Sequence, residues 1–150
     1  DVHAFAPCRK LILGGVDIPH HQGLDGHSDA DVLAHAISDA LLGAVRGGDI
    51  GKLFPDTDPA YKDADSLKLL AEVARFVRER GFEIIDVDSV IAAQAPKLSP
   101  YREAMRENLA AAMGVPVENV GVKATTTEHL GHEGREEGIT AYATCLVCRI

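Results

Sequence analysis

Residues 26–48 read GHSDADVLAHAISDALLGAVRGG and carry the clearest helix signal of the chain. Apolar residues recur there at helical spacing, at Leu33, Ile37, Ala40, Leu41 and Ala44. The stretch opens with Ser28-x-x-Asp31, which is similar to a capping box, and Gly47-Gly48 supplies a stop signal. We therefore expect a helix that Ser28 caps, that buries one face, and that ends before the two glycines.

One face of this expected helix is polar. Asp31, His35 and Asp39 lie four residues apart, so they stack acid, imidazole and acid along one helical face. A purely structural amphipathic helix has no need of such a stripe. His27 and Ser28 precede the helix, where an anion would meet free backbone N–H groups and the positive end of the helix dipole. The simpler alternative is that Ser28 only caps the helix.

The chain begins with Asp1-Val2-His3. In an extended segment residues two apart point to the same side, so Asp1 and His3 can present a carboxylate and an imidazole to one point. With His35 as third ligand, this set suits a catalytic zinc ion whose fourth position stays open. The alternative is two solvated residues and a satisfied helix histidine, which spacing alone does not separate from a metal site. The polar stripe favours the metal, because Asp31 or Asp39 can accept the second N–H of His35.

Composition restricts the class of protein. A chain of 150 residues that is 46% hydrophobic has the material for the core of one domain, residues 1–150. The net charge of −8 and the lack of a basic run argue against nucleic acid as a partner. No apolar run reaches the roughly 20 residues of a membrane span. The three cysteines do not form the pattern of a disulfide framework. Cys145 and Cys148 fall on opposite faces of an expected strand, which argues against a redox pair. We therefore expect a reducing, cytoplasmic location. A plastid location applies if a segment before Asp1 was removed.

Strand and helix patterns alternate along the chain. Expected strands cover residues 1–5, 11–13, 16–18, 82–93, 117–125 and 139–147, with Gly14-Gly15 as a hairpin turn. Two further helices are expected, one capped by Ser66 and running to Gly81, and one over residues 100–113. Residues 49–65 are too rich in proline and aspartate for a regular element, and long loops are often functional. The order indicates an α+β fold with a mixed, mostly antiparallel sheet and helices on one side.

A second cluster of chemical groups is expected at Lys123-Ala124-Thr125-Thr126-Thr127-Glu128, at the end of a strand. Hydroxyl and backbone N–H groups can bind phosphate oxygens there. The plain alternative is a run of threonines with strand propensity, but it leaves Glu128 unexplained. A carboxylate beside a phosphate requires a hard cation such as Mg²⁺ or Mn²⁺ between them.

With these blocks in view, the chain resembles the 2-C-methyl-D-erythritol 2,4-cyclodiphosphate synthase family nearly end to end. The resemblance rests on Asp1-Val2-His3, Gly26-His27-Ser28-Asp29-Ala30-Asp31, His35-Ala36, Asp39-Ala40-Leu41-Leu42-Gly43, Gly48-Asp49-Ile50-Gly51, Phe54-Pro55-Asp56-Thr57-Asp58-Pro59, Ala93-Gln94-Ala95-Pro96-Lys97 and the Lys123 to Glu128 block. It implies a phosphorus–oxygen lyase of isoprenoid (terpenoid) biosynthesis by the non-mevalonate pathway. The substrate would be 4-diphosphocytidyl-2-C-methyl-D-erythritol 2-phosphate. Its 2-phosphate would attack the β-phosphate, giving the cyclic diphosphate and CMP.

The resemblance also implies an assembly and a metal set. The protein would be a homotrimer around a three-fold axis, with active sites between subunits and no membrane or nucleic-acid partner. Zinc would be held by Asp1, His3 and His35, and a second cation, Mg²⁺ or Mn²⁺, by Glu128. His27 and Thr126 would be catalytic, steadying the transition state.

The resemblance further implies which residues contact the substrate. On the methylerythritol diphosphate side they are Asp1, Val2, His3, His27, Ser28, Asp49, Ile50, Gly51, Phe54, Pro55, Asp56, Thr57 and Asp58. On the nucleotide side they are Ala93, Gln94, Ala95, Pro96, Lys97, Leu98, Ser99 and Thr125, and the set is completed by Thr126, Thr127, Glu128, His132 and Arg135.

Three departures from the family pattern stand out. The chain begins at the expected ligand Asp1, so we expect that residues precede it. His132 stands where the family has an apolar residue near the trimer axis, and Glu136 stands where a glycine is common. Two rival functions remain at this stage. One is a zinc-dependent phosphohydrolase in which the open position carries hydroxide, and the other is a zinc-stabilised trimeric protein that only binds nucleotides.

Overall fold

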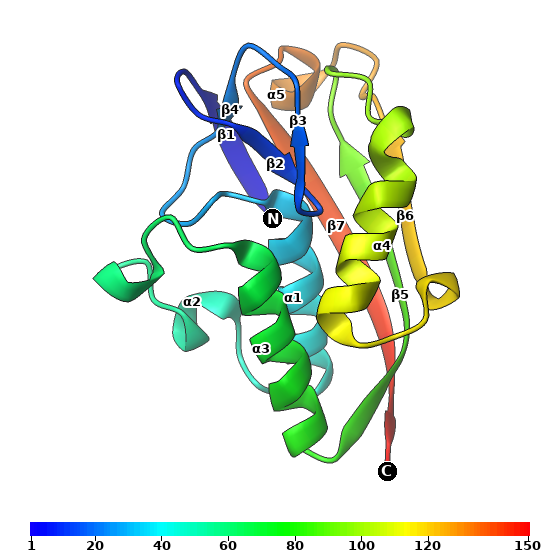
Figure 1. Cartoon of the computed structure of the whole chain (residues 1–150). Coiled ribbons are helices and arrows are strands. Elements are labelled where there is room, and N and C mark those ends of the chain that lie inside the picture. The colour runs from blue at the N-terminus through cyan, green and yellow to red at the C-terminus, as the bar shows by residue number, and fades with distance from the viewer.

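A five-stranded sheet forms one layer of the computed structural model, which describes residues 1–150 (Figure 1). The strand order is β4-β1-β7-β5-β6, with bounds Gly23–Leu24, Val2–Ala6, Gly138–Arg149, Phe82–Ala92 and Val120–Thr125. Only β5 and β6 pair in parallel, and the other three pairings are antiparallel. The hairpin of β2 (Leu11–Leu13) and β3 (Val16–Ile18) forms a separate two-stranded sheet. The mixed, mostly antiparallel sheet is thus confirmed.

The three long helices cover one face of this sheet (Figure 1). They are α1 (Val32–Ala44), α3 (Ser66–Glu79) and α4 (Arg102–Met113). Two short helices, α2 (Ile50–Leu53) and α5 (Gly131–Gly134), lie in the connections. Single 3₁₀ turns occupy Pro59–Tyr61, Ser99–Tyr101 and Val117–Asn119. The stretch 49–65, which was expected to be irregular, therefore contains α2 and one 3₁₀ turn. The strand expected over residues 117–125 is shorter than predicted, because its first three residues form a 3₁₀ turn and only Val120–Thr125 is extended.

Helix α1 begins later than its sequence predicted. Asp31 is the N-cap, and its side chain accepts a hydrogen bond from the backbone N–H of Ala34 at 3.1 Å. Ser28 is not the cap, because the chain turns through a left-handed Ala30 (φ 59°) before the helix starts. The helix stops at Ala44, and the left-handed residue that closes it is Arg46 (φ 58°) instead of a glycine.

Asp31 also joins the β2–β3 hairpin to the start of α1. Its two carboxylate oxygens accept hydrogen bonds from the N–H groups of Gly14 and Gly15 at 2.9 and 2.8 Å. The side chain is fully buried, and this burial raises the pKa of Asp31 to about 6. Asp31 is therefore a structural link and not part of a solvated polar stripe.

Helix α3 shows the same displacement of a cap. Asp65, not Ser66, is the N-cap, and it accepts a hydrogen bond from the N–H of Leu67 at 2.9 Å. Ser66 becomes the first residue of the helix, and its side chain is buried. Asp49 and Asp58 likewise cap the short turns that follow them. The aspartates of residues 49–65 thus serve partly as caps, which explains why that stretch holds two helical turns.

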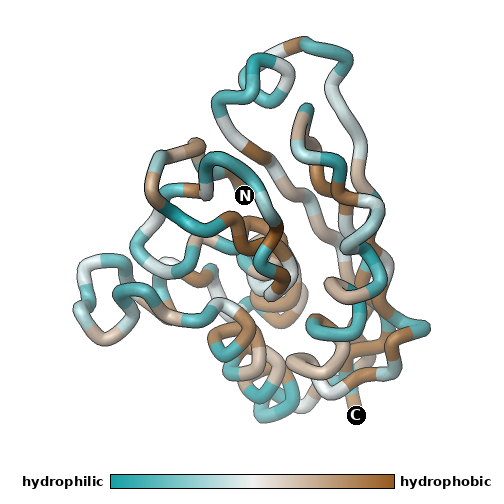
Figure 2. Tube along the Cα trace, turned by 45° about the horizontal axis from the view of Figure 1, so that its top comes forward, coloured by the Kyte–Doolittle hydropathy of each residue, from teal (hydrophilic) through white to brown (hydrophobic).

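The core lies between the helices and the sheet. Figure 2 shows hydrophobic stretches at the centre of the molecule and mostly hydrophilic loops around them. In β7, Cys145 faces inward, where its Sγ lies 3.4 Å from the carbonyl oxygen of Ala40, while Cys148 is exposed. The prediction that these two cysteines lie on opposite faces is confirmed. Tyr142 and Leu146 stay 60% exposed, on the sheet face that the helices leave uncovered.

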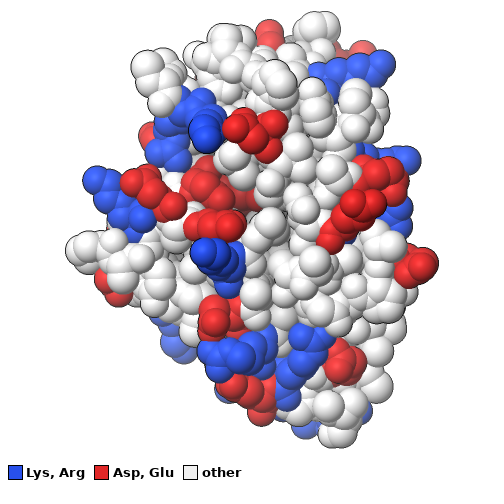
Figure 3. All heavy atoms as spheres, viewed as in Figure 1, with Lys and Arg blue, Asp and Glu red and all other residues white.

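The helical surface carries charges of both signs. Acidic and basic side chains are interspersed on the face seen in Figure 3, and no extended basic patch appears there. No helix of the fold combines the length and the apolar character needed to cross a membrane.

Candidate metal centre and active-site cavity

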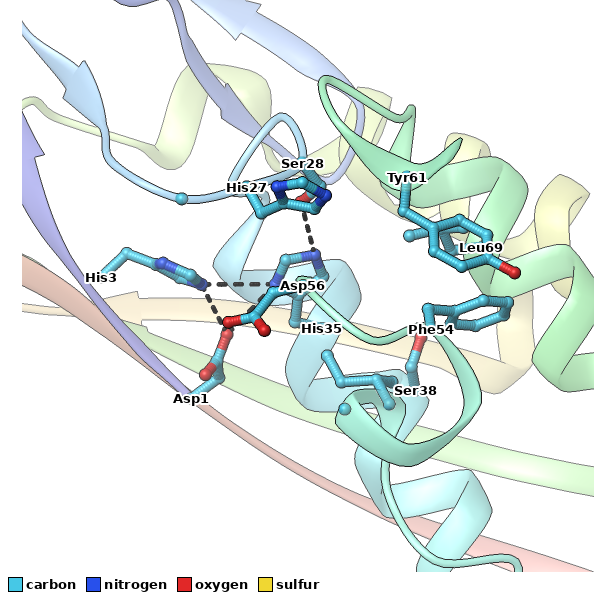
Figure 4. Close-up of a pocket in the computed structure, with 13 residues that line it drawn as sticks. Asp1, His3, His27, Ser28, His35, Ser38, Phe54, Asp56, Tyr61 and Leu69 are labelled. Carbon is cyan, nitrogen blue, oxygen red and sulfur yellow. Dashed lines mark hydrogen bonds and ion pairs between the residues drawn. The ribbon is translucent and has the colours of Figure 1, made fainter. Parts of the chain in front are cut away.

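Three predicted ligands converge between the sheet and α1 (Figure 4). His3 lies on β1, and Asp1 stands just before it, paired through its carbonyl oxygen with the N–H of Ala141 at 2.8 Å. His35 comes from the first turn of α1. Oδ2 of Asp1 lies 2.9 Å from Nε2 of His3 and 3.3 Å from Nδ1 of His35. The two ring nitrogens are 3.3 Å apart. The strand spacing and the helix therefore produce the cluster that the sequence predicted.

The outer hydrogen bonds define which ring nitrogens carry protons. Nδ1 of His3 lies 2.8 Å from the carbonyl oxygen of Asp25, which can only accept, so Nδ1 carries the hydrogen. Nε2 of His35 lies 2.8 Å from Oγ of Ser66. The Ser66 hydroxyl donates its own hydrogen to the carboxylate of Asp29, so it accepts from His35. Nε2 of His3 and Nδ1 of His35 are therefore left as lone pairs.

These lone pairs and the Asp1 carboxylate meet with no hydrogen between them. Burial lowers the pKa of both His3 and His35, which favours the neutral imidazoles that bind metals. Three electron-pair donors within hydrogen-bond distance of one another repel unless a cation lies among them. The donor set thus fits a divalent metal ion, with protein ligands for three of its positions.

The predicted outer partner of His35 is wrong. Neither Asp31 nor Asp39 accepts its second N–H: Asp31 caps α1, and Asp39 accepts from the N–H of Ile50 at 2.9 Å. Ser66 and Asp29 take this role instead. Sequence patterns missed them because Ser66 stands where a helix cap is expected. The only available signal was the neighbouring Asp65, an equally good cap that leaves Ser66 free.

The metal-ligand cluster forms one wall of a cavity of about 340 Å³. Its lining residues are Asp1, His3, Gly26, His27, Ser28, His35, Ser38, Ile50, Gly51, Phe54, Asp56, Tyr61 and Leu69. Gly26, Ser38, Tyr61 and Leu69 were not predicted as site residues. Tyr61 packs edge-on against Phe54 at 5.3 Å between ring centroids, a contact that could be anticipated only from the proximity of two aromatic residues in the loop.

His27 ties the loop of residues 54–65 to this cavity. Its Nε2 donates a hydrogen bond to the carbonyl oxygen of Asp58 at 2.9 Å, and its own carbonyl accepts from the N–H of Asp63 at 2.8 Å. His27 does not stand at the N-terminus of α1, because the helix starts at Val32. The prediction that the end of this helix meets an anion at His27 and Ser28 is therefore wrong, although both residues line the cavity. Val2, Asp49, Pro55, Thr57 and Asp58 lie outside the cavity lining.

The predicted nucleotide residues gather at a second cavity, of about 290 Å³. Its lining residues are Ala93, Gln94, Pro96, Lys97, Leu98, Ser99, Ala124, Thr125 and Thr126. The parallel pairing of β5 and β6 brings the ends of both strands together, because Ala92 is the partner of Thr125. Lys123 points elsewhere and forms an ion pair with Asp88 at 2.7 Å.

The remaining predicted residues line neither cavity. Thr127 donates its hydroxyl hydrogen to the carbonyl oxygen of Leu130 at 2.6 Å, and Glu128 is exposed with a left-handed backbone (φ 55°). Nε2 of His132 lies 3.0 Å from Oγ1 of Thr140, and Arg135 forms an ion pair with Glu137. Within one chain, Glu128 and the three-ligand cluster therefore do not share a cavity.

Known proteins match this chain over nearly its whole length. A family model described as the YgbB family matches residues 1–148. A 2-C-methyl-D-erythritol 2,4-cyclodiphosphate synthase of Chlorobium phaeobacteroides (strain BS1) is 59% identical over 147 residues, which are 98% of this chain and 92% of the relative. The enzyme of the same name from Desulfitobacterium hafniense (strain DSM 10664 / DCB-2) is 60% identical over 148 residues, 98% of this chain and 94% of the relative.

Solved structures agree with these sequence matches. The bifunctional IspDF of Campylobacter jejuni superposes with a TM-score of 0.96 at 46% identity, over 100% of this chain and 41% of that longer chain. A 2C-methyl-D-erythritol-2,4-cyclodiphosphate synthase described as the CDP-bound form superposes with a TM-score of 0.89 at 37% identity, over 99% of this chain and 96% of that one. This chain therefore belongs to the YgbB family, that of the 2-C-methyl-D-erythritol 2,4-cyclodiphosphate synthases.

Proposed function

We propose that this chain converts 4-diphosphocytidyl-2-C-methyl-D-erythritol 2-phosphate to 2-C-methyl-D-erythritol 2,4-cyclodiphosphate and CMP, as a phosphorus–oxygen lyase of isoprenoid precursor biosynthesis. The 2-phosphate attacks the β-phosphorus of the same molecule. The bond from that phosphorus to the bridging oxygen breaks, and CMP leaves with that oxygen. The observation that carries the proposal is the set of unprotonated ligand atoms on the wall of a cavity, in a chain of this family.

Asp1, His3 and His35 would hold the ion, which we propose is zinc because three ligands of the carboxylate and imidazole type are typical of catalytic zinc sites. Zinc bound there would supply Lewis acidity toward a phosphate oxygen and keep one position open for it. The protein's own contribution is to place the substrate's phosphates beside these ligands. Because both reacting groups belong to one molecule, holding them in contact supplies much of the rate enhancement.

His27 is proposed to face the reacting phosphates. Its Nε2–H is engaged by the carbonyl oxygen of Asp58, so Nδ1 is the ring atom left for the substrate. Nδ1 donates a hydrogen bond to a phosphate oxygen when the imidazole is protonated. The bond to Asp58 also keeps the loop of residues 54–65 beside the cavity, so His27 links loop position to substrate position.

The other end of the cavity suits the methylerythritol part. Asp56 offers a carboxylate that can accept hydrogen bonds from hydroxyl groups, and Phe54 and Tyr61 offer apolar surface beside it. Ile50 and Gly51 line the same region through α2. Asp49, expected to contact the substrate, has its side chain engaged in capping α2, where it accepts a hydrogen bond from the N–H of Lys52 at 2.8 Å. We propose that Asp49 acts through the position of α2.

The active site is proposed to form between neighbouring copies of a homotrimer. The metal ligands and the proposed nucleotide residues belong to different cavities within one chain. Docking of a second copy that places its residues 93–99 and 125–128 beside the first cavity would complete the site. Glu128 of that copy would then hold the second cation, Mg²⁺ or Mn²⁺, and Thr126 would contact the phosphates. His132 and Arg135 would lie toward the three-fold axis.

An uncovered apolar surface is consistent with such an assembly. Tyr142 and Leu146 project from the face of β7 that carries no helix, and each is 60% exposed. Val2, the first residue of β1, is 53% exposed. Apolar side chains grouped on an open sheet face are typical of protein interfaces. A mass measurement that resolves oligomers, combined with elemental analysis, should give a trimer with one zinc ion per chain.

Product analysis tests the reaction. Purified protein with Zn²⁺ and Mg²⁺ should release CMP and the cyclic diphosphate, and isotopically labelled water should leave no label in either product. Label in the product would instead indicate a phosphohydrolase, and a lack of CMP would leave only a nucleotide-binding role. His35→Ala should abolish bound zinc and turnover but keep the fold, because the apolar face of α1 is unchanged. His21→Ala is the matched control, since His21 is exposed and lies outside both cavities.

A further inference from the structure

A short chain of hydrogen bonds runs from His35 away from the metal-ligand cluster. Nε2 of His35 donates to Oγ of Ser66 at 2.8 Å, and the hydroxyl of Ser66 donates in turn to Oδ1 of Asp29. Ser66 is only 1% exposed, and His35 is 8% exposed. The three residues come from α1, from the first residue of α3, and from the turn that precedes α1. These hydrogen bonds therefore join the start of α3 to α1 and to the turn that precedes it, more than 30 residues earlier in the sequence.

Asp29 is itself fixed by the backbone around it. Its Oδ1 accepts a hydrogen bond from the N–H of Asp31 at 3.1 Å, and its Oδ2 accepts from the N–H of Ser66 at 3.1 Å. Its own N–H donates to the carbonyl oxygen of Ala64 at 3.0 Å. A carboxylate held at both oxygens cannot turn away from the Ser66 hydroxyl without losing these bonds. The hydroxyl consequently keeps its lone pairs toward His35.

We infer that Ser66, backed by Asp29, is a positioning residue for the metal centre. Together they hold the imidazole of His35 in the tautomer that has hydrogen on Nε2 and a lone pair on Nδ1. Without this pair, His35 can rotate or place its hydrogen on Nδ1, which removes one ligand atom from the cluster. The inference rests on the metal site of the proposed function. It adds that the first residue of α3 controls the affinity of that site for its metal ion.

Ser28 is the rival partner for the same N–H. Its Oγ lies 3.2 Å from Nε2 of His35, farther than Oγ of Ser66, and it already accepts the N–H of Ala30 at 3.2 Å. No carboxylate polarises the Ser28 hydroxyl in the way that Asp29 polarises Ser66. Ser66 is therefore the stronger acceptor, and Ser28 limits the effect of losing Ser66 without cancelling it.

Zinc affinity measured by chelator competition tests the inference. Loss of an outer hydrogen-bond partner of a ligand histidine weakens metal binding by about 10- to 100-fold, and Ser66→Ala should raise the dissociation constant by about tenfold. Ser66→Thr, which keeps a hydroxyl group, should restore most of the affinity. The control is Ser89→Ala, because Ser89 is an equally buried serine whose hydroxyl donates to a carbonyl oxygen, that of Gly121, in the sheet. It should leave zinc affinity within about threefold of the wild type.

A double-mutant cycle separates the relay from general damage. Asp29→Asn should weaken zinc binding in the wild-type background and have little further effect in the Ser66→Ala background, because the hydrogen-bond link from the carboxylate to His35 runs through the hydroxyl. Equal effects of Asp29→Asn in both backgrounds would overturn the inference. So would a Ser66→Ala protein with wild-type zinc affinity. If Ser66→Ala fails to fold, Asp29→Asn paired with Asp29→Ala still reports on the relay, and unchanged zinc affinity in both overturns it.

The tautomer itself is observable without metal. Long-range nitrogen–proton NMR spectra of the metal-free protein should show His35 with hydrogen on Nε2, and Ser66→Ala should shift the ring toward a mixture of tautomers. A ring that stays in the Nε2–H form in the Ser66→Ala protein would overturn the inference. Wild-type protein that binds no zinc would count against the metal site of the proposed function, and this NMR measurement would still test the relay on its own.

Discussion

Gly134→Ala should damage the second half of the proposed site and spare the metal centre. Gly134 ends α5, and a Cβ atom at this position would lie 2.2 Å from the carbonyl carbon of His129 and 2.7 Å from its Cα. Both are backbone atoms, so no side chain can rotate to make room. Non-bonded carbon atoms sit about 3.5–4.0 Å apart, so His129 and its neighbours must move by more than about 1 Å.

The displaced segment carries Glu128, the residue proposed to hold the second cation. Glu128 directly precedes His129, and the N–H of His129 donates a hydrogen bond to Oε1 of Gln94 at 3.0 Å. Movement of His129 therefore shifts Glu128 and loosens the nucleotide cavity that Gln94 lines. A misplacement of about 1 Å in a catalytic site costs on the order of 100-fold in rate. Overpacking should also lower stability, by about 1–3 kcal/mol.

Steady-state kinetics and zinc content give the readout. We expect kcat to fall by about 100-fold and zinc per chain to stay unchanged, because Asp1 directly precedes β1, His3 lies on β1 and His35 lies on α1. Gly43→Ala is the matched control: a Cβ there meets nothing within 4 Å, and alanine in a helix should add about 0.5–1 kcal/mol of stability. The reasoning is refuted if Gly134→Ala keeps its rate within about threefold of the wild type, or if it loses zinc as well.

Three further predictions test individual residues. Glu128→Gln should spare zinc binding and weaken the Mg²⁺ or Mn²⁺ dependence of turnover; an unchanged metal titration curve would remove Glu128 from the site. Burial raises the pKa of Asp31 to about 6, so folded Asp31 keeps its proton where the unfolded chain has lost it. The wild-type unfolding free energy should therefore fall relative to Asp31→Asn by about 2 kcal/mol between pH 4.5 and 6.5 in urea titrations, and a pH-independent difference would contradict this assignment. Burial raises the pKa of the Cys145 thiol, so mass spectrometry should show alkylation of exposed Cys8 well before Cys145; equal rates would contradict it.

Periodicity was sufficient to predict the three long helices and the long strands, because each depends on neighbours within a few residues, but it missed the short elements β4, α2 and α5. Leu33, Ile37 and Leu41 predict α1 and are fully buried in it. The hairpin around Gly14-Gly15 is also local, since both glycines adopt positive φ values of 56° and 73°. For the strands, the type of sheet could be predicted, but the partner and register of each strand could not. The sequence indicated a mixed sheet, but the parallel register of β5 with β6 joins residues more than 30 positions apart and has no local signal.

The helix caps were mispredicted for a physical reason. Serine and aspartate are about equally good N-caps, so a local pattern cannot choose between Ser28 and Asp31, or between Ser66 and Asp65. In both cases the aspartate caps the helix and the serine hydroxyl turns toward His35. The choice is decided by tertiary contacts, because His35 needs an acceptor in a buried position. Because Asp31 is the cap of α1, its side chain does not accept the N–H of His35, although the spacing of four residues had suggested that it would.

The two halves of the proposed site rest on parts of the fold with different constraints. The proposed metal ligands come from β1, from the residue that precedes it and from the buried α1, where no buried side-chain polar atom lacks a hydrogen-bond partner. A change there must break several satisfied bonds at once. Glu128, by contrast, lies on an exposed turn held by single bonds such as that from His129 to Gln94. If a neighbouring copy completes the site, this turn gains its partners only on assembly, so substitutions in it should alter turnover and second-cation dependence while zinc content stays fixed.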